Sequence, residues 1–213
     1  MGLAVGVGVL ADLLENDREG AKWLDDGLVA ANRLLEKAGL PSHAEPRMLE
    51  RPAKRASIRS FPYSFIHYLR RAYAYRIADP SWVASGVCDD VDPARDPILE
   101  QEMEMLRSHL LCHSDAEGFY MPVDFRDVLF ENYDPGVTGG MLGSSHRLRE
   151  ELILVAPALG IRLSDGRLSN EEAARIDHIA RSDDGLCREH CSWLALYEAA
   201  RISIELKTAI VFC

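Results

Sequence analysis

The chain has 213 residues, of which 47% are hydrophobic and 27% are charged, as in an ordinary globular protein. Its 24 Lys and Arg residues and 34 Asp and Glu residues give a formal net charge of −10, so the chain repels phosphate backbones and we expect no nucleic acid as a partner. This charge suits a basic protein partner, although keeping the protein soluble is a sufficient reason for it.

The first predicted element is a strand over residues 3–10, where residues alternate between two faces and one face carries Gly6 and Gly8. With Ala11, these glycines also fit the G-x-G-x-x-G/A pattern of dinucleotide sites. That pattern needs a helix at its last position, whereas the next capping signal is at Asn16, and no second strand follows. We therefore expect close packing against the glycine face, and we expect Val at Gly6 or Gly8 to unfold the protein.

Capping residues and apolar spacing predict about six helices. Asp96 before Pro97 fits an N-cap followed by proline, and Ser169 with Glu172 fits a capping box. The acidic, turn-rich residues 85–96 are expected to form a mobile loop. The predicted helices cover about residues 17–38, 62–78, 97–106, 145–156, 170–181 and 186–206.

The remaining strands are predicted near the middle and at the end of the chain. Residues 109–124 contain two apolar runs around a short polar turn, which indicates a β-hairpin, and residues 208–213 indicate a last strand. Because strands and helices do not alternate, we predict an α+β fold in a single domain over residues 1–213. Its small mixed or antiparallel sheet would have about four strands covered by about six helices, with the first and last strands paired centrally.

The predicted hairpin gathers side chains that suit catalysis. His113 and Asp115 would lie on the same face of a strand, and Asp124 would approach from the neighbouring strand. A histidine–carboxylate pair facing a cleft is a candidate general base, and Tyr120 is a candidate ligand contact. The alternative is that His113 is a buried histidine with satisfied hydrogen bonds.

A second candidate site is the Gly-rich stretch GGMLGSSHR, residues 139–147, which leads into a helix. Free N–H groups at a helix start attract anions, so Gly140, Ser144, Ser145 and Arg147 are candidate ligand-binding residues. The stretch matches neither a Walker loop nor a nucleophile elbow. The alternative is a tight turn with a serine N-cap.

The five cysteines do not form a disulfide framework. Cys187 and Cys191 would share a helix face and supply half of a zinc site, and Cys112 is a third weak candidate. Because no second ligand pair completes the site, we expect reduced, packed thiols with no metal and no cofactor. No basic segment precedes an apolar run and no run is long enough for a bilayer, so we expect a cytoplasmic protein without membrane contact. The sequence does not indicate an oligomeric state.

Three stretches, VLADLLENDREGA, SHLLCHSDAEGFYMPVDF and GGMLGSSHRL, resemble those of an uncharacterised group of acidic bacterial proteins. The resemblance covers most of the chain. It implies a bacterial, cytoplasmic setting and assigns neither an activity nor a site residue.

These features predict a non-enzymatic acidic binding protein that recognises a protein partner, such as an immunity or antitoxin-like factor. The acidic loops at 85–96 and 114–117 and the lack of a complete catalytic constellation favour this function. The alternative is a small-molecule-binding protein or hydrolytic enzyme with its pocket between the 109–124 hairpin and the 139–147 turn. The sequence alone does not decide whether the protein is an enzyme.

Overall fold

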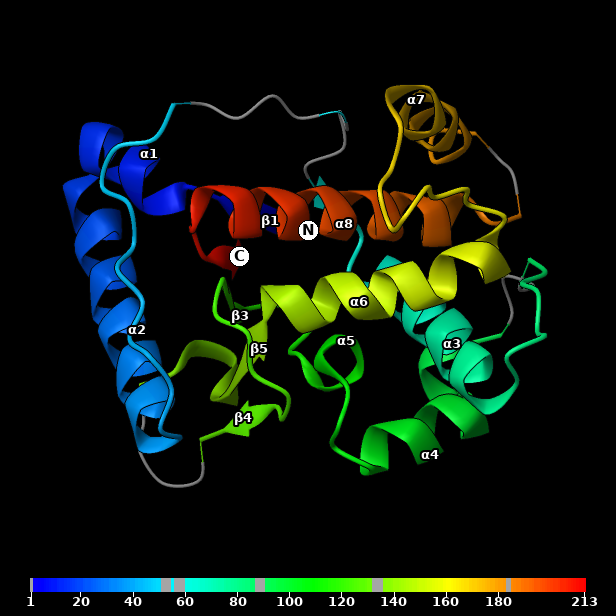
Figure 1. Ribbon diagram of the computed structural model, residues 1–213, viewed down its shortest axis with the longest axis horizontal. Coiled ribbons are helices and arrows are strands. Elements are labelled where there is room, and N and C mark those ends of the chain that lie inside the picture. Colours follow the sequence, from blue (N-terminus) through cyan, green and yellow to red (C-terminus); the bar gives the residue numbers. More distant parts are fainter. Residues whose placement is uncertain (1, 51–54, 56–59, 87–90, 132–135, 183–184) are drawn as a thin grey trace.

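The computed structural model of the chain describes residues 2–50, 55, 60–86, 91–131, 136–182 and 185–213. In this part of the chain, six strands form one mixed sheet and eight α-helices surround it (Figure 1), which confirms the α+β class with more elements than expected. The strands are β1 (Leu3–Val7), β2 (Ser60–Phe61), β3 (Gly118–Met121), β4 (Leu129–Phe130), β5 (Met141–Ser144) and β6 (Ile210–Phe212). The helices are α1 (Val9–Asn16), α2 (Arg18–Lys37), α3 (Ser64–Ala78), α4 (Pro97–Glu104), α5 (His109–Cys112), α6 (Ser145–Val155), α7 (Asn170–Ile179) and α8 (Cys187–Leu206).

The strand order in the sheet is β2-β1-β6-β3-β5-β4. The first and last strands pair in antiparallel orientation, with Val5 opposite Phe212, so the predicted pairing of the two ends of the chain is confirmed. β3 pairs with β6 in antiparallel orientation and with β5 in parallel. Since β1 is antiparallel to both of its neighbours, it does not belong to a dinucleotide-binding βαβ unit.

The predicted hairpin over residues 109–124 is wrong. Its first half forms α5, and β3 pairs with strands that are distant in the sequence. The hydroxyl group of Ser108 accepts a hydrogen bond from the amide of Leu111 at 3.0 Å, and the Glu151 carboxylate accepts from the amides of His109 and Leu110 at 2.9 and 2.6 Å. These acceptors satisfy the free N–H groups of a helix that has only four residues.

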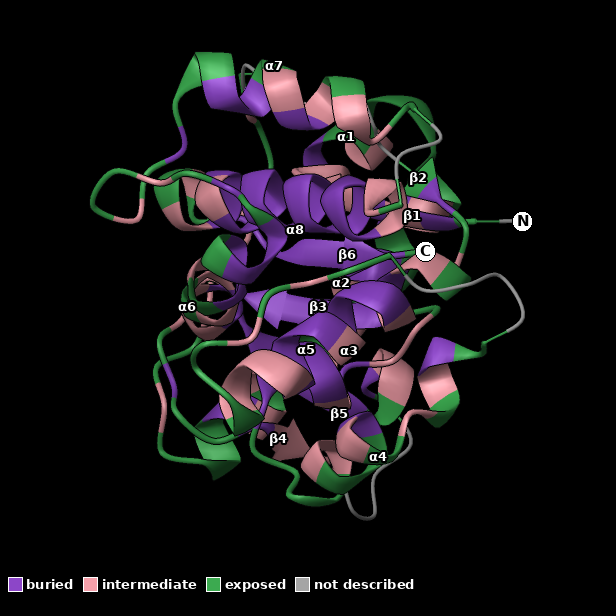
Figure 2. Cartoon of the chain, turned by 90° about the vertical axis from the view of Figure 1, so that its right-hand side faces the viewer, coloured by how far each residue is buried: buried purple, intermediate pink, exposed green. Residues whose placement is uncertain are grey.

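The core lies on both faces of the sheet. Tyr120 of β3 and Phe212 of β6 belong to a large apolar cluster with residues of α3, α6 and α8. Phe119 and Val211, the residues next to them in the chain, belong to a second cluster with residues of α1 and α2. This alternation places the central strands between two helical layers, where nearly all of their surface is buried (Figure 2).

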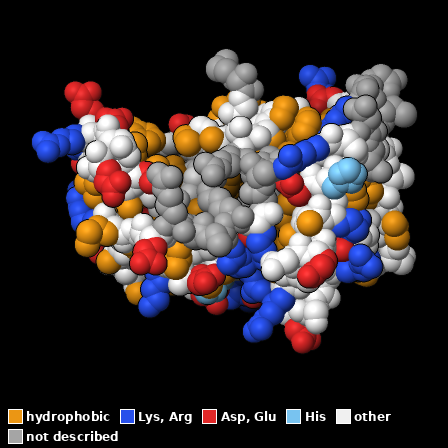
Figure 3. Space-filling model, turned by 90° about the horizontal axis from the view of Figure 1, so that it is seen from above, with side chains coloured by type: hydrophobic (Ala, Val, Ile, Leu, Met, Phe, Trp, Pro, Cys, Tyr) orange, Lys and Arg blue, Asp and Glu red, His pale blue; other side chains and the backbone are white. Residues whose placement is uncertain are grey.

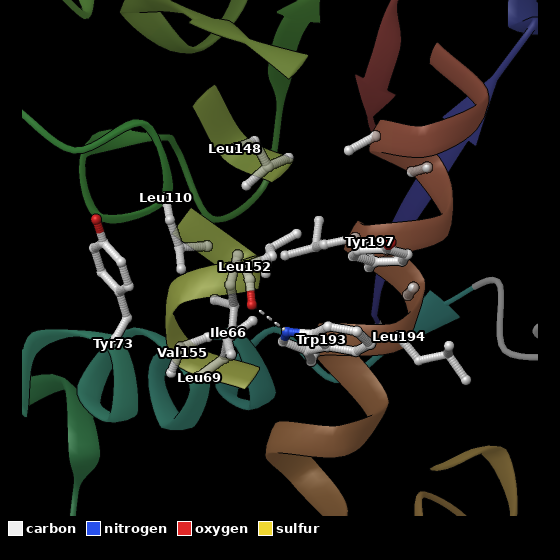
Figure 4. Close-up of a cluster of buried hydrophobic side chains, with 14 of the residues drawn as sticks. Ile66, Leu69, Tyr73, Leu110, Leu148, Leu152, Val155, Trp193, Leu194 and Tyr197 are labelled. Carbon is white, nitrogen blue, oxygen red and sulfur yellow. Dashed lines mark hydrogen bonds between the residues drawn. The ribbon is translucent and has the colours of Figure 1, made fainter. Parts of the chain in front are cut away.

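Helix α8 is the centre of the larger cluster. Trp193 and Tyr197 are almost fully buried and stack with ring centroids 4.7 Å apart. The indole N–H of Trp193 donates to the carbonyl oxygen of Leu152 at 2.8 Å, which joins α8 to α6 (Figure 4). This contact satisfies the polar group of a large side chain inside an apolar core.

The glycines near the N-terminus differ in their roles. β1 ends at Val7, before Gly8, which has a φ of 69° and occupies the N-cap position of α1, so it is not the strand residue that we expected. Gly6 lies in β1, and a Cβ atom there would be 2.4 Å from Cγ2 of Val9. The close approach expected at Gly6 is therefore present and comes from the helix that directly follows the strand.

The predicted N-caps of α4 and α7 are confirmed: Asp96 and Ser169 accept hydrogen bonds from the helix amides. α2 begins one residue later than expected, because Asp17 and not Asn16 caps it. Of the mobile loop expected over 85–96, residues 87–90 lie outside the described residues, whereas residues 93–95 form a short 3-10 helix and Asp96 caps α4. None of the described helices is long and apolar enough to cross a membrane.

Candidate functional site

The candidate base His113 lies in the core, where only 2% of its surface is exposed. Its ring stacks on Tyr120 at 4.1 Å, and its Nδ1 and Nε2 atoms lie 3.0 and 3.3 Å from the carbonyl oxygens of Ser114 and Phe119. Burial lowers the pKa of His113 to about 4, so the ring is neutral at physiological pH. Tyr120 is also buried, and its hydroxyl group donates to the carbonyl oxygen of His109 at 2.9 Å.

The two candidate carboxylates engage different arginines. Asp115 forms ion pairs with the buried Arg70 and, at 3.0 Å, with His67. Partial burial opposes ionisation of Asp115, but the hydrogen bond from His67 and the charge of Arg70 hold its pKa well below the usual range. Asp124 pairs with Arg147 at 2.8 Å. The structure therefore gives His113, Asp115 and Asp124 separate structural partners and assembles no acid–base pair from them.

The two segments predicted to flank a pocket lie side by side, because β3 and β5 pair in parallel. At Gly143 a Cβ atom would be 2.3 Å from Cδ1 of Tyr120, so the tyrosine ring packs directly on this glycine. The hydroxyl group of Ser144 donates to the carbonyl oxygen of Val123 at 2.7 Å. At these points the contact between the segments is close packing of the core.

The candidate anion-binding residues of the Gly-rich stretch have structural contacts. Gly140 has a φ of 71° in the turn before β5, and Ser144 is the N-cap of α6. Ser145 is fully buried and shares a hydrogen bond with Ser203 at 2.7 Å. Arg147 forms ion pairs with Asp124 and Glu150, which neutralise its charge. These contacts give the serines and glycines of the stretch a role in stabilising the fold.

The candidate metal ligands are placed in two helices. Cys112 ends α5, whereas Cys187 and Cys191 lie one turn apart in α8. Burial raises the pKa of Cys191 to about 12, which keeps its thiol protonated. Within the described residues, no group of three or more His, Cys, Asp and Glu side chains is arranged to hold a metal ion.

The negative charge of the chain is concentrated in one region, which we call the acidic segment: residues 89–134. It holds 13 Asp and Glu residues and 3 Arg residues, a net charge of −10, while the rest of the chain holds 21 acidic and 21 basic residues and is neutral. The segment contains α4, α5, β3 and β4. In Figures 1 and 2, α4 and β4 lie at the lower end of the molecule, so the carboxylates of α4 lie at that end of the fold.

Several carboxylates of the acidic segment face solvent without a counter-ion. Glu100 and Glu104 of α4, together with Glu117 and Asp127, are exposed and form no ion pair among the described residues. Glu100 and Glu104 are four residues apart, which places them on one face of α4 about 6 Å apart along the helix axis. Glu100 and Glu104 are held by α4, whereas Glu117 directly precedes β3 and Asp127 lies in the connection before β4.

The total charge and the acidic loops at 85–96 and 114–117 are evident in the sequence, whereas no local pattern marks Glu100, Glu104 or Asp127. Their signal is the charge balance of a window of the sequence, which shows three basic residues among residues 89–134. What this array can do chemically is attract a complementary array of Lys and Arg side chains.

Comparison with known proteins gives one finding. A family model described as "Putative DNA-mimic protein" matches residues 1–212, nearly the whole chain. No curated protein and no solved structure matches the chain. The sequence led us to expect a possible basic protein partner and no nucleic acid, and this match corrects that expectation, because the family description relates its members to DNA.

Proposed function

Because this chain belongs to the family of putative DNA-mimic proteins, we propose that it binds the DNA-binding surface of a DNA-binding protein, with its acidic segment in the place of the phosphates. The observation that carries the proposal is the concentration of the whole net charge of −10 in residues 89–134. A surface that binds DNA presents Lys and Arg side chains to phosphate groups, and exposed carboxylates attract the same side chains.

Apolar side chains beside the carboxylates support a protein as the partner. Met105 and Leu106 directly follow α4 and are 55% and 58% exposed. Leu106 has a φ of 52°, an uncommon conformation for leucine, which turns the chain sharply at the end of the helix. Exposed apolar groups surrounded by charged residues are typical of the centre and rim of a protein interface.

Such binding would explain how an antitoxin-like protein inhibits its partner. The chain would inhibit its partner by occupying the DNA site, and this needs binding alone, without a catalytic step. Because no DNA duplex takes part in this complex, its formation would not release the counter-ions that condense on DNA. The complex would still weaken with added salt, since it depends on attraction between exposed charges.

A competition experiment tests the proposal. DNA-binding proteins of the source organism, eluted from DNA-cellulose, are passed over the immobilised chain at low salt. We expect a stoichiometric partner that is released by double-stranded DNA as well as by salt. The fourfold variant Glu100→Gln, Glu104→Gln, Glu117→Gln and Asp127→Asn should fail to retain this partner.

A matched variant controls for net charge. Glu15→Gln, Glu19→Gln, Glu50→Gln and Asp165→Asn also neutralise four exposed carboxylates outside the acidic segment, so both variants change the formal charge from −10 to −6. The control should retain the partner. The proposal fails if DNA does not compete, or if both fourfold variants lose the partner equally.

A further inference from the structure

A cleft lined by arginines opens on the other side of the molecule. Its volume is about 620 Å³, and Arg55, Arg149, Arg167 and Arg201 line it together with Tyr197. It lies between α6, α8 and the turn that precedes α7, toward the upper side in Figure 1. Figure 3 looks down on this side, where Lys and Arg side chains gather to the right of the centre. In a chain with a net charge of −10, four guanidinium groups around one cleft need an explanation.

Acidic residues compensate only part of this charge. The buried carboxylate of Glu198 accepts hydrogen bonds from Arg55 at 2.6 Å and from Arg201 at 3.0 Å. Arg201 also bonds Glu205 at 2.8 Å. Arg149 and Arg167, by contrast, have no carboxylate partner among the described residues. The cleft therefore keeps an excess of positive charge.

The fold holds Arg149 in place without a carboxylate. Its guanidinium group donates to the carbonyl oxygen of Gly166 at 3.0 Å and lies over the ring of Tyr197, 5.9 Å from the centroid. The hydroxyl group of Tyr197 donates to the same carbonyl oxygen at 2.7 Å. Because Tyr197 is fixed in the core, Arg149 is positioned before any ligand arrives.

A tight turn positions Arg167 in the lining of the cleft. Ser164 and Arg167 exchange two backbone hydrogen bonds, at 3.0 and 2.9 Å. The two residues between them, Asp165 and Gly166, have φ values of 49° and 69°, as in a type I′ turn. The side chain of Arg167 is exposed, and Asn170, the first residue of α7, lies beside it in the lining of the cleft.

We propose that this cleft binds a phosphorylated small molecule. Guanidinium groups donate pairs of hydrogen bonds to phosphate oxygens, and within the described part of the chain Arg149 and Arg167 are the two that no carboxylate neutralises. The volume is in the range of small-ligand sites. Free phosphates and nucleotides share the phosphate group that this arrangement recognises. The site is independent of the acidic segment and does not rest on the proposed function.

Calorimetric titration of the full chain with inorganic phosphate, pyrophosphate and ATP, at ionic strength of about 0.15 M, tests the proposal. We expect one molecule of at least one probe to bind per chain. Arg167→Gln should raise its Kd about tenfold or more, because a charge-assisted hydrogen bond is lost. Arg126→Gln removes an exposed arginine outside the cleft and should leave the Kd unchanged. Equal Kd values for pyrophosphate and ATP would indicate phosphate groups alone, and tighter ATP binding a nucleotide.

A second variant keeps the test decisive. Arg149→Lys retains the charge but loses the planar fork, so it should also weaken binding, and thermal unfolding curves would verify that each variant is folded. The absence of binding for all three probes would overturn the proposal. So would equal weakening by Arg167→Gln and Arg126→Gln. Self-association of the chain that depends on Arg167, without binding of any probe, would show a protein interface and would also overturn it.

Discussion

The buried carboxyl group of Glu151 makes the stability of the protein depend on pH. Besides the amides of His109 and Leu110, the hydroxyl group of Ser108 donates to it at 3.1 Å. Burial outweighs these hydrogen bonds and raises the pKa of Glu151 to about 7 from its ordinary value of 4.5. The folded protein therefore holds this proton more tightly than the unfolded chain. The stability that Glu151 contributes is fully present below pH 4.5 and is lost as the pH rises through about 7.

The size of this effect follows from the two pKa values. The difference between 4.5 and about 7 corresponds to about 3 kcal/mol in the free energy of unfolding. His113 acts in the opposite direction, since burial lowers its pKa from 6.5 to about 4. Its contribution is present above pH 6.5 and is lost as the pH falls through about 4. Between about pH 4.5 and 6.5, the effects of these two groups nearly cancel in the unmodified protein.

Glu151→Gln removes one of the two opposing titrations and keeps the size of the side chain. Urea denaturation followed by tryptophan fluorescence at several pH values measures the free energy of unfolding. The variant should be less stable than the unmodified protein at about pH 4.5, and this deficit should shrink by about 3 kcal/mol by about pH 7.5. Glu150→Gln changes an exposed neighbour on α6, so its free energy of unfolding should vary with pH in parallel with that of the unmodified protein. A deficit of Glu151→Gln that is constant over this range would refute the reasoning.

Three substitutions test the packing. Gly8→Val puts a β-branched residue at a φ of 69° and should lower the free energy of unfolding by about 2 kcal/mol, and an unchanged urea midpoint would contradict the left-handed conformation. Gly6→Val brings a Cβ atom to 2.4 Å from Cγ2 of Val9 and should cost about 1–3 kcal/mol in the same assay, part of which Val9→Ala should restore. Both glycine variants should therefore be destabilised and still folded, in place of the unfolding expected from the sequence. Trp193→Phe loses the 2.8 Å hydrogen bond to Leu152 and leaves a void, for a loss of about 3 kcal/mol by urea denaturation, and full stability would show that neither matters.

Local signals were sufficient to predict most helices. The Asp96 carboxylate accepts from the amide of Ile98 at 3.0 Å, and the Ser169 hydroxyl group accepts from the amide of Glu172 at 3.1 Å. Each of these bonds joins residues two or three positions apart, so a short window of sequence contains both partners. The start of α2 was displaced by one residue, because adjacent Asn and Asp residues cap helices about equally well.

The sheet was less predictable because its determinants are distant in the sequence. A short apolar run after Ser108 fits a strand as well as a helix, and Glu151, which caps α5, lies in another helix. β5 was missed because Gly143 is typical of a turn. The reason for this glycine is the ring of Tyr120 in the neighbouring strand, which no local pattern contains.

The candidate site shows the same division. The net charge of −10 is a property of the sequence, and the binding by charge that it suggested fits the description of the family. The assembly of Arg55, Arg149, Arg167 and Arg201 around one cleft depends on the packing of α6 and α8 and on the turn before α7. Residues so far apart in the chain share no periodicity, and the net charge of the whole chain does not indicate that a positively charged cleft is present.

The two charged surfaces of this protein should act independently. The acidic segment includes α4 and β4 at the lower end of the molecule, and the cleft is lined from α6, α8 and the turn that precedes α7, which lie above them (Figures 1 and 2). At physiological ionic strength the Debye length is about 8 Å, so exposed charges at opposite ends of a domain are screened from each other. Neutralising Glu100 and Glu104 should therefore leave the Kd for a phosphate probe unchanged, and Arg167→Gln should leave retention of a DNA-binding partner unchanged. If either change altered both activities, the surfaces would be coupled through the conformation of α6 and α8, since direct electrostatics would not reach across the fold.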